Sequence, residues 1–220
     1  MPNITPQRQS RAAAWFQTPE ARSVLVSGWP HLAAVCDTRP NMPVVCVSVM
    51  GKPEAFSALP LPSKVWFSAW NGGYGGDAHC THPWPLPSES IGTLVLHHVT
   101  DTGIDRDALL EDCYRVLLPG GQLFVFALNP LSPVRRWWWR HRMRAAEPSS
   151  LRLALRRQGF HCDTSTMGFG PVWRDTADAK SSRGAGTRAA YLLHAEKRTI
   201  PLTPLRAKPA RAQAVPGLAK

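Results

Sequence analysis

Hydrophobic residues in this chain form short uninterrupted runs, separated by polar stretches that contain Gly and Pro. Residues 44–49 (Val-Val-Cys-Val-Ser-Val) and 93–96 (Thr-Leu-Val-Leu) are the clearest runs, and neither alternates between apolar and polar side chains. Such runs are typical of strands that are buried on both faces of a parallel sheet. Residues 64–68 form a weaker strand pattern, and we expect the Gly-rich residues 71–76 after them to form a flexible surface turn.

Residues 93–128 carry the best pattern. Between the run at 93–96 and a further buried run at 122–128, apolar residues recur with helical spacing on one face, at Leu109, Leu110, Cys113, Val116 and Leu117. Asp105 can cap the start of this helix, and Pro-Gly-Gly at 119–121 can end it. A strand, a helix and a strand within about 35 residues predict a βαβ unit with parallel pairing and a right-handed crossover.

Weaker patterns flank this unit. Residues 12–25 predict a helix with Pro19 in its first turn. Residues 150–158 predict another, which Ser149 or Ser150 caps and Gly159 stops. We expect strands at 160–167 and 189–195.

The two ends of the chain lack any core pattern. Residues 1–11 are polar, and the residues after 198 are mostly Pro, Ala, Lys and Arg. We therefore expect a disordered lead-in at 1–11, one folded domain at 12–198 and a disordered basic tail at 199–220.

The net charge of +11 is distributed unevenly. Residues 131–220 carry 18 Lys and Arg against 5 Asp and Glu, whereas the rest of the chain is slightly acidic. Any electrostatic attraction to nucleic acid or anionic lipid must therefore come from the C-terminal part.

Composition also suggests where the protein acts. Five widely spaced cysteines without a C-x-x-C pair favour reduced thiols over disulfides or a zinc site. The apolar stretches are too short to span a bilayer, and the polar N-terminus does not have the pattern of a signal peptide. We expect a cytoplasmic protein with no transmembrane segment and no bound metal.

Residues 84–121 contain motifs that resemble the type 11 branch of the class I S-adenosylmethionine-dependent methyltransferases. Members of this family have a leucine-proline-phenylalanine turn before the fourth strand, and residues 84–91 (Trp-Pro-Leu-Pro-Ser-Glu-Ser-Ile) resemble it. Their helix then leads into an R-V-L-x-P-G-G turn before the fifth strand. Residues 115–121 (Arg-Val-Leu-Leu-Pro-Gly-Gly) match that turn at each fixed position.

Segments outside this block extend the resemblance to a bacterial subgroup of methyltransferase-like proteins. They are residues 15–19, 129–132, 191–198 and 201–204. The resemblance implies an α/β fold: a single Rossmann-like class I methyltransferase domain with a mostly parallel sheet and an antiparallel C-terminal strand. It also implies S-adenosylmethionine as the cofactor and leaves the methyl acceptor unknown.

The cofactor-binding residues that the resemblance implies are only partly present. The family has a Gly-rich turn after the first strand and an acidic residue at the end of the second. Here Ser48 ends the first strand and Gly51 is the one glycine that follows it, while the second strand ends in Ser-Ala-Trp without a carboxylate. Asp77 is the nearest acidic candidate, and its alternative role is that of a turn aspartate.

Trp84 and His97 complete the candidate cofactor-binding residues, which are Ser48, Gly51, Asp77, Trp84 and His97. His97 and His98 follow a strand where the family places residues near the cofactor or the acceptor. One histidine can face a cleft and act as a base, or both can simply end the strand. Methyl transfer needs mainly the alignment of nucleophile and methyl group, so we assign no catalytic residue.

The most unusual local composition is Arg135-Arg136-Trp137-Trp138-Trp139-Arg140. Arginine interleaved with tryptophan can bind nucleic acid by phosphate contacts and base stacking. It can also lie on an anionic membrane, or form a helix whose Trp face covers the sheet or the substrate cleft.

Two functions are therefore open from the sequence. The first is an S-adenosylmethionine-dependent methyltransferase with an activity that the degenerate cofactor motif weakens or abolishes. The second is a non-catalytic protein of the same fold that binds nucleic acid or anionic membrane through the Arg/Trp segment and the basic tail.

Overall fold

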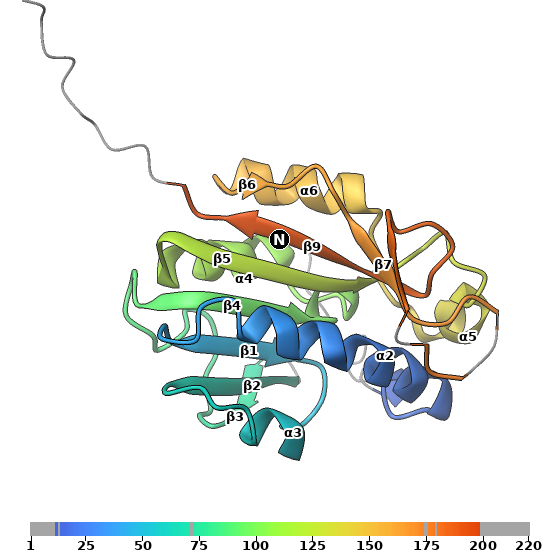
Figure 1. Cartoon of the computed structure of the whole chain (residues 1–220), viewed down its shortest axis with the longest axis horizontal. Helices are drawn as coiled ribbons and strands as arrows, with labels where there is room; N and C mark the ends of the chain where they lie inside the picture. The colour runs from blue at the N-terminus through green and yellow to red at the C-terminus, as the bar shows by residue number, and fades with distance from the viewer. Residues whose placement is uncertain (1–11, 13, 71–72, 174–175, 179, 199–220) are drawn as a thin grey trace, which may run out of the picture.

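A computed structural model describes residues 12, 14–70, 73–173, 176–178 and 180–198. Within them, one nine-stranded sheet has the order β3-β2-β1-β4-β5-β9-β7-β8, and β6 pairs with β9 (Figure 1). The strands are β1 Val44–Ser48, β2 Lys64–Trp70, β3 Gly73–Gly76, β4 Ile91–His97, β5 Leu117–Leu128, β6 His161–Cys162, β7 Met167–Phe169, β8 Ser181–Arg183 and β9 Ala190–Glu196. The expected lead-in (1–11) and tail (199–220) lie outside the described residues.

The centre of the sheet is parallel and its margins are antiparallel. β2, β1, β4 and β5 pair in parallel, whereas β9 pairs with β5 in the antiparallel sense. Every residue of β1 and β4 is buried, which is why their sequences are continuous apolar runs. The predicted fold class, a mostly parallel Rossmann-like sheet with an antiparallel C-terminal strand, is confirmed.

Helices cover both faces of the sheet (Figure 1). They are α2 Pro19–Cys36, α3 Glu54–Ser57, α4 Arg106–Val116, α5 Arg135–Trp138 and α6 Pro148–Arg157, with 3₁₀ turns η1 Val99–Asp101 and η2 Trp139–His141. The β4-α4-β5 unit confirms the predicted βαβ unit. As expected, the side chain of Asp105 caps α4, accepting hydrogen bonds from the backbone N–H groups of Asp107 and Ala108.

The single helix predicted at 12–25 is wrong in its bounds, because residues 16–18 form a turn and a bend and helix α2 begins only at Pro19. Thr18 caps it, Pro19 occupies the first helical position as expected, and the helix continues past Pro30 to Cys36. Leu32 and Cys36 are fully buried, so packing against the sheet outweighs the hydrogen bond that Pro30 cannot make.

The Gly-rich segment also differs from expectation, because residues 73–76 form strand β3 and not a free turn. β3 pairs antiparallel with β2, and Gly76 has a φ of +121°. A Cβ atom at Gly76 would lie 2.4 Å from the carbonyl oxygen of Trp66, so only glycine fits this close approach.

The C-terminal third of the structure contains the predicted elements, with some differences in their bounds. β9 confirms the strand expected at 189–195, whereas residues 160–167 hold only β6 and the first residue of β7. Helix α6 begins at Pro148 after Glu147, so the expected cap at Ser149 or Ser150 is wrong by two to three positions. Gly159 follows the helix with a φ of +96°, as a stop signal should.

Candidate functional site

The order of the strands reverses between β1 and β4. From β1 the chain proceeds outward to β2 and β3, and from β4 it proceeds outward in the other direction to β5. Ligands of open parallel sheets bind beyond the carboxyl ends of the strands at such a point. Ser48 and His97 are the last residues of β1 and β4, and they are paired in the register. Two predicted site residues therefore meet at the expected place.

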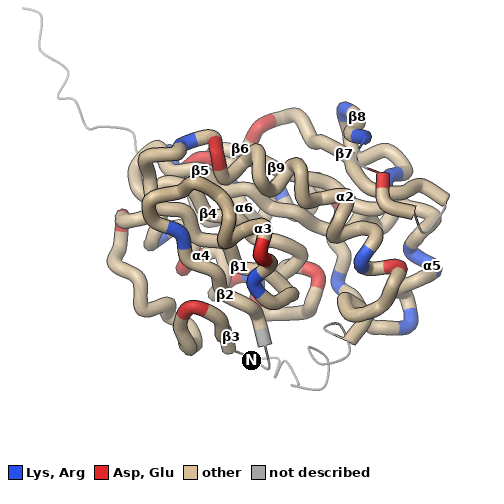
Figure 2. Tube along the Cα trace, turned by 60° about the horizontal axis from the view of Figure 1, so that its bottom comes forward, with Lys and Arg blue, Asp and Glu red and all other residues tan. Residues whose placement is uncertain are grey.

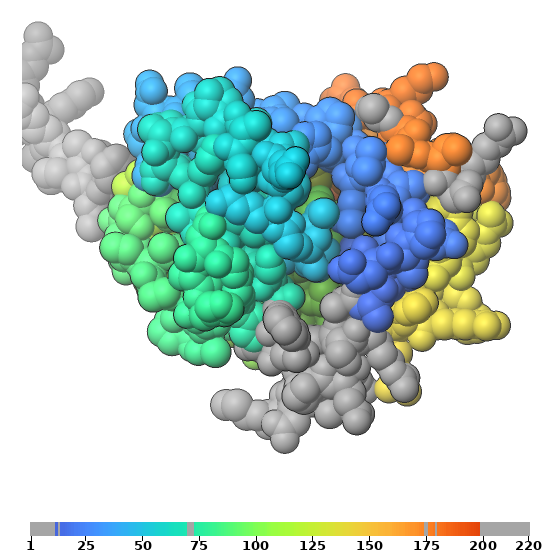
Figure 3. Space-filling view, turned by 90° about the horizontal axis from the view of Figure 1, so that it is seen from below, coloured from blue at the N-terminus to red at the C-terminus, as the bar shows by residue number. Residues whose placement is uncertain are grey.

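A pocket of about 570 Å³ opens at this point, a size that suits a small-molecule ligand. Its walls come from α2 and the residue stretch before it on one side, and from the loop after β1 with α3 on the other. In Figure 3 they appear in blue and cyan. Its lining is mostly apolar and aromatic: Phe16, Gln17, Arg22, Leu25, Val26, Trp29, Pro30, Met50, Gly51, Pro53, Ala55, Trp66 and His97.

The side chain of His97 is held by Ser48. The backbone N–H of Met50 donates to Ser48 Oγ over 3.2 Å, so the Ser48 hydroxyl hydrogen is free to point elsewhere. Ser48 Oγ lies 3.0 Å from Nδ1 of His97. We assign the hydroxyl as the donor to Nδ1, which places the ring hydrogen on Nε2.

His97 thus presents a neutral N–H donor. Burial, with a smaller contribution from neighbouring His98, holds the pKa of His97 well below its ordinary value. The side chain is buried and lines the pocket, yet Nε2 has no hydrogen-bond partner among the described residues. An unpaired buried donor costs about 1–3 kcal/mol, which a ligand with an acceptor atom can recover. In this state the ring of His97 offers an N–H donor, and it is not the proton-accepting base that the sequence left open.

His98 follows the last residue of β4 and is not among the residues that line the pocket. It has a φ of +59°, is fully buried and lies with its Nδ1 3.0 Å from Asp101 Oδ2. The same carboxylate oxygen accepts the backbone N–H of Leu128. His98 therefore joins the end of β4 to the end of β5.

The loop after β1 is held by side chains of β2. The carbonyl oxygen of Met50 accepts hydrogen bonds from Trp66 Nε1 at 3.1 Å and from Ser68 Oγ at 3.0 Å. Gly51 follows and lines the pocket, and a Cβ atom built on it would meet no atom within 4 Å. The space beside Gly51 is therefore open.

Asp77 does not line this pocket. Its carboxylate accepts hydrogen bonds from Lys52 Nζ at 2.9 and 3.0 Å and from the backbone N–H of Trp66 at 2.9 Å. Partial burial would raise the pKa of Asp77, but these hydrogen bonds outweigh it and lower the pKa. The carboxylate joins the loop after β1 to the β2–β3 hairpin, which extends the turn role that the sequence offered as the alternative.

Trp84 lies on the other face of the sheet, against Phe67 and Tyr74. It is 2% exposed and does not line the pocket. Its backbone N–H donates to Asp112 Oδ2 on α4, and its carbonyl oxygen accepts a hydrogen bond from Arg115. In this structure Trp84 attaches the connection before β4 to α4.

Arg115 gives the turn motif at 115–121 a structural role. Its guanidinium donates to the carbonyl oxygens of Trp84 and Leu86 and pairs with Asp112 at 2.7 Å. His82 completes this network, since its ring lies between Tyr74 OH at 2.7 Å and Asp112 Oδ2 at 2.5 Å. The motif supports the framework and contributes nothing to the pocket lining.

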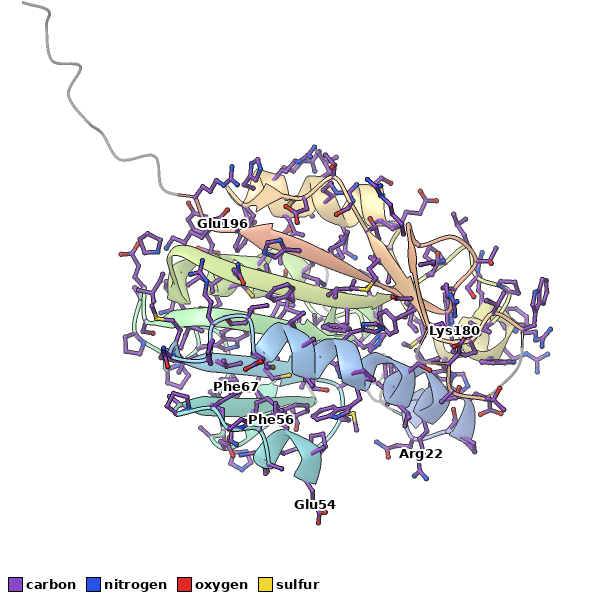
Figure 4. The ribbon with its side chains drawn as sticks, in the orientation of Figure 1. Arg22, Glu54, Phe56, Phe67, Lys180 and Glu196 are labelled. Atoms are coloured by element: carbon purple, nitrogen blue, oxygen red, sulfur yellow. The ribbon has the colours of Figure 1, made fainter. Side chains whose placement is uncertain are left out.

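The aromatic wall of the pocket was not among the predicted site residues. Phe16 lies just before α2, and Trp29 lies on α2 beyond the predicted end of that helix. Trp66 lies in the middle of β2. Arg22, also on α2, adds a charged side chain to the lining. Figure 4 shows Arg22 extending from the N-terminal half of α2. The capping pattern Thr18-Pro19 was the available signal for this helix.

The Arg/Trp segment divides between core and surface. Trp138 is 4% exposed, Trp137 is half-buried and Trp139 is 59% exposed. Trp138 therefore belongs to the hydrophobic core, whereas Trp139 does not. The segment contributes no residue to the pocket lining.

Metal sites, disulfides and membrane-spanning helices can each be assessed for the described residues. They contain no group of three or more His, Cys, Asp or Glu side chains placed to hold a metal ion. All five cysteines are free thiols. No helix in this part of the chain is long and apolar enough to cross a membrane.

Comparisons with known proteins identify the fold. No protein-family model matches the chain, and no curated protein sequence matches it significantly. Solved structures match over most of its length. A SAM-dependent methyltransferase of Thermotoga maritima, described as a possible histamine N-methyltransferase, has a TM-score of 0.63 at 19% identity, covering 90% of this chain and 100% of that one.

Two further structures agree. A SAM-dependent methyltransferase of Archaeoglobus fulgidus has a TM-score of 0.56 at 13% identity, covering 80% of this chain and 94% of the other. A Burkholderia thailandensis 1,6-didemethyltoxoflavin-N1-methyltransferase, with its substrate and S-adenosylhomocysteine bound, has a TM-score of 0.58 at 11% identity, covering 90% and 93%. The chain has the fold of the S-adenosylmethionine-dependent methyltransferases.

Proposed function

We propose that this protein is an S-adenosylmethionine-dependent methyltransferase that binds its cofactor in the pocket between α2 and the loop after β1. One observation carries the proposal: His97, whose buried Nε2 has no partner among the described residues, lines a pocket at the point where the strand order reverses. The fold and the residues 115–121 add support, because both are shared with that class of enzymes.

The pocket lining suits most parts of the cofactor. Arg22 is the charged residue of the lining and can pair with the cofactor's carboxylate. The half-buried ring of Trp29 can stack on adenine or attract a sulfonium through its π face, while the almost fully buried Phe16 and Trp66 add apolar lining. His97 can donate to a nitrogen or oxygen acceptor, because its Nε2–H is free.

One requirement is poorly met. No Asp or Glu side chain is among the residues that line the pocket, so the ribose hydroxyls lack the usual carboxylate acceptor. Losing such an acceptor costs about 1–3 kcal/mol, which corresponds to roughly a tenfold to hundredfold weaker affinity. We therefore expect a dissociation constant well above that of a tight cofactor site.

Bound S-adenosylmethionine supplies an electrophilic methyl group on sulfur. The chain's own contribution is to align and shield the reactants. The apolar walls formed by Leu25, Val26 and Pro53 exclude water from the pocket, and Ser48 holds the His97 ring in one orientation. Alignment of this kind can account for most of the rate acceleration of a methyl transfer. The reaction needs no acid or base when the acceptor is already nucleophilic.

Isothermal titration calorimetry with S-adenosylmethionine and S-adenosylhomocysteine tests the proposal. Both ligands should bind the wild-type protein. Gly51→Phe should abolish binding, because the new ring enters space that is open in the wild type, while the unfolding temperature stays close to that of the wild type. The absence of heat at millimolar ligand with the folded wild-type protein would refute the proposal and favour a non-catalytic role for the same fold.

Two substitutions of His97 separate the contributions of its two nitrogens. In His97→Asn the amide oxygen can accept the Ser48 hydroxyl hydrogen, but the donor toward the pocket is lost. In His97→Gln a donor toward the pocket is kept, and the contact with Ser48 is lost. We expect about threefold to tenfold weaker binding for Asn than for Gln. Asp77→Asn should leave the affinity unchanged, and a large loss there would restore Asp77 as a cofactor ligand.

A further inference from the structure

The short helical segment after β5 separates apolar anchors from exposed basic residues. Val134 and Trp138, four positions apart, are 1% and 4% exposed and pack into the core. Arg135 and Arg136 on α5 and Arg140 on the following η2 turn are exposed. The anchors therefore hold the arginines on the outside of the molecule.

Exposed apolar side chains accompany these arginines. Of the six large hydrophobic residues exposed in the described part of the chain, three lie here: Leu131, Trp139 and Trp173, at 67%, 59% and 64%. Arg136 Nη2 donates to the carbonyl oxygen of Trp173 over 3.2 Å, which places residue 173 beside α5 although it is distant in sequence. We call Leu131, Arg135, Arg136, Trp139, Arg140 and Trp173 the Arg/Trp patch.

The described residues provide no ion-pair partner for the arginines of the patch, Arg135, Arg136 and Arg140. Figure 2 shows basic residues around α5 at one end of the molecule. The guanidinium of Arg140 lies 5.2 Å from the centroid of the Trp139 ring, so charge and aromatic surface occur together.

We propose that the Arg/Trp patch binds the surface of an anionic lipid bilayer. Exposed Trp side chains prefer the membrane interface, and arginines beside them can pair with lipid phosphates. A single-stranded nucleic acid would use the arginines and the Trp rings, but it would gain nothing from Leu131, which cannot stack on a base. The exposed aliphatic side chain favours lipid. This proposal does not depend on cofactor binding.

Vesicle flotation with the full-length protein tests it. Vesicles of phosphatidylcholine with about a third phosphatidylglycerol should bind the protein at low salt, and pure phosphatidylcholine vesicles should bind it much less. Arg135→Gln combined with Arg140→Gln should weaken binding about 30-fold, since each basic side chain near an anionic surface contributes about fivefold. Leu131→Ser combined with Trp139→Ser should weaken it about tenfold without any change in charge.

The matched control is Arg156→Gln combined with Arg157→Gln, which removes the same charge from exposed positions on α6. This variant should bind vesicles nearly as the wild type does. Equal losses in both arginine pairs would show attraction by net charge alone and overturn the proposal. So would the absence of vesicle binding. Tight binding of a single-stranded DNA oligonucleotide that depends on Trp139 but not on Leu131 would assign the patch to nucleic acid instead.

Discussion

Acidification should destabilise this protein in part through His97. Burial holds the pKa of His97 well below its ordinary value, so the folded protein keeps the ring neutral while the unfolded chain takes up a proton below pH of about 6.5. The contribution of His97 to the free energy of unfolding is therefore fully present above its pKa in the unfolded chain. This contribution is lost as the pH falls toward its pKa in the folded protein. Between about pH 7.5 and pH 5.0 this loss amounts to about 2 kcal/mol for one histidine that stays neutral when folded.

Urea unfolding followed by tryptophan fluorescence at the two pH values measures this effect. The comparison is with His97→Asn, which cannot titrate and whose amide oxygen can still accept the Ser48 hydroxyl hydrogen. Other acid-sensitive groups, including His98 and Asp101, are present in both proteins. Their contributions to the loss of stability therefore largely cancel in the comparison. The wild type should lose about 2 kcal/mol more than the variant, equivalent to about 4–8 °C in Tm for a domain of this size. An equal loss of unfolding free energy in the wild type and the variant would refute the burial of a neutral His97.

Three further substitutions test individual contacts by thermal or urea unfolding. Arg115→Ala should cost about 2–4 kcal/mol, because it leaves a buried carboxylate and two carbonyl groups without their partner, and a cost below about 1 kcal/mol would contradict the network. Trp138→Ala should cost about 3–5 kcal/mol, whereas Trp139→Ala, which is largely exposed, should stay within about 0.5 kcal/mol. Gly120→Ala should cost about 1–2 kcal/mol because its φ is +74°, and Gly51→Ala should be nearly neutral.

The parallel half of the fold could be predicted because its signals are local. The buried strands β1 and β4 read as continuous apolar runs, and α4 carries a cap at Asp105 together with one apolar face. Each signal depends on neighbouring residues in the sequence. The meeting of Ser48 with His97 also followed, because the carboxyl ends of neighbouring parallel strands share one edge.

The remainder depends on contacts between distant residues. Asp77 is a plausible ligand residue by composition, and only the position of Lys52 shows that its carboxylate is already paired. The Gly-rich segment lacks any strand pattern, yet β3 forms because Gly76 permits a close approach to Trp66. The aromatic wall could not be found because Trp29 and Trp66 are 37 positions apart in sequence and meet only through the fold.

The attachment of the segment before β4 to α4 has a consequence for local opening of the native protein. The amide groups of Trp84, Glu89 and Ser90 donate to Asp112 Oδ2 and to the carbonyl oxygens of Arg115 and Val116. These acceptors are all on the C-terminal half of α4, although the donors belong to a connection without regular structure. In hydrogen–deuterium exchange, the three amides should exchange at the slow rate of α4 and not at that of a surface loop. The connection and the helix then open as one cooperative unit.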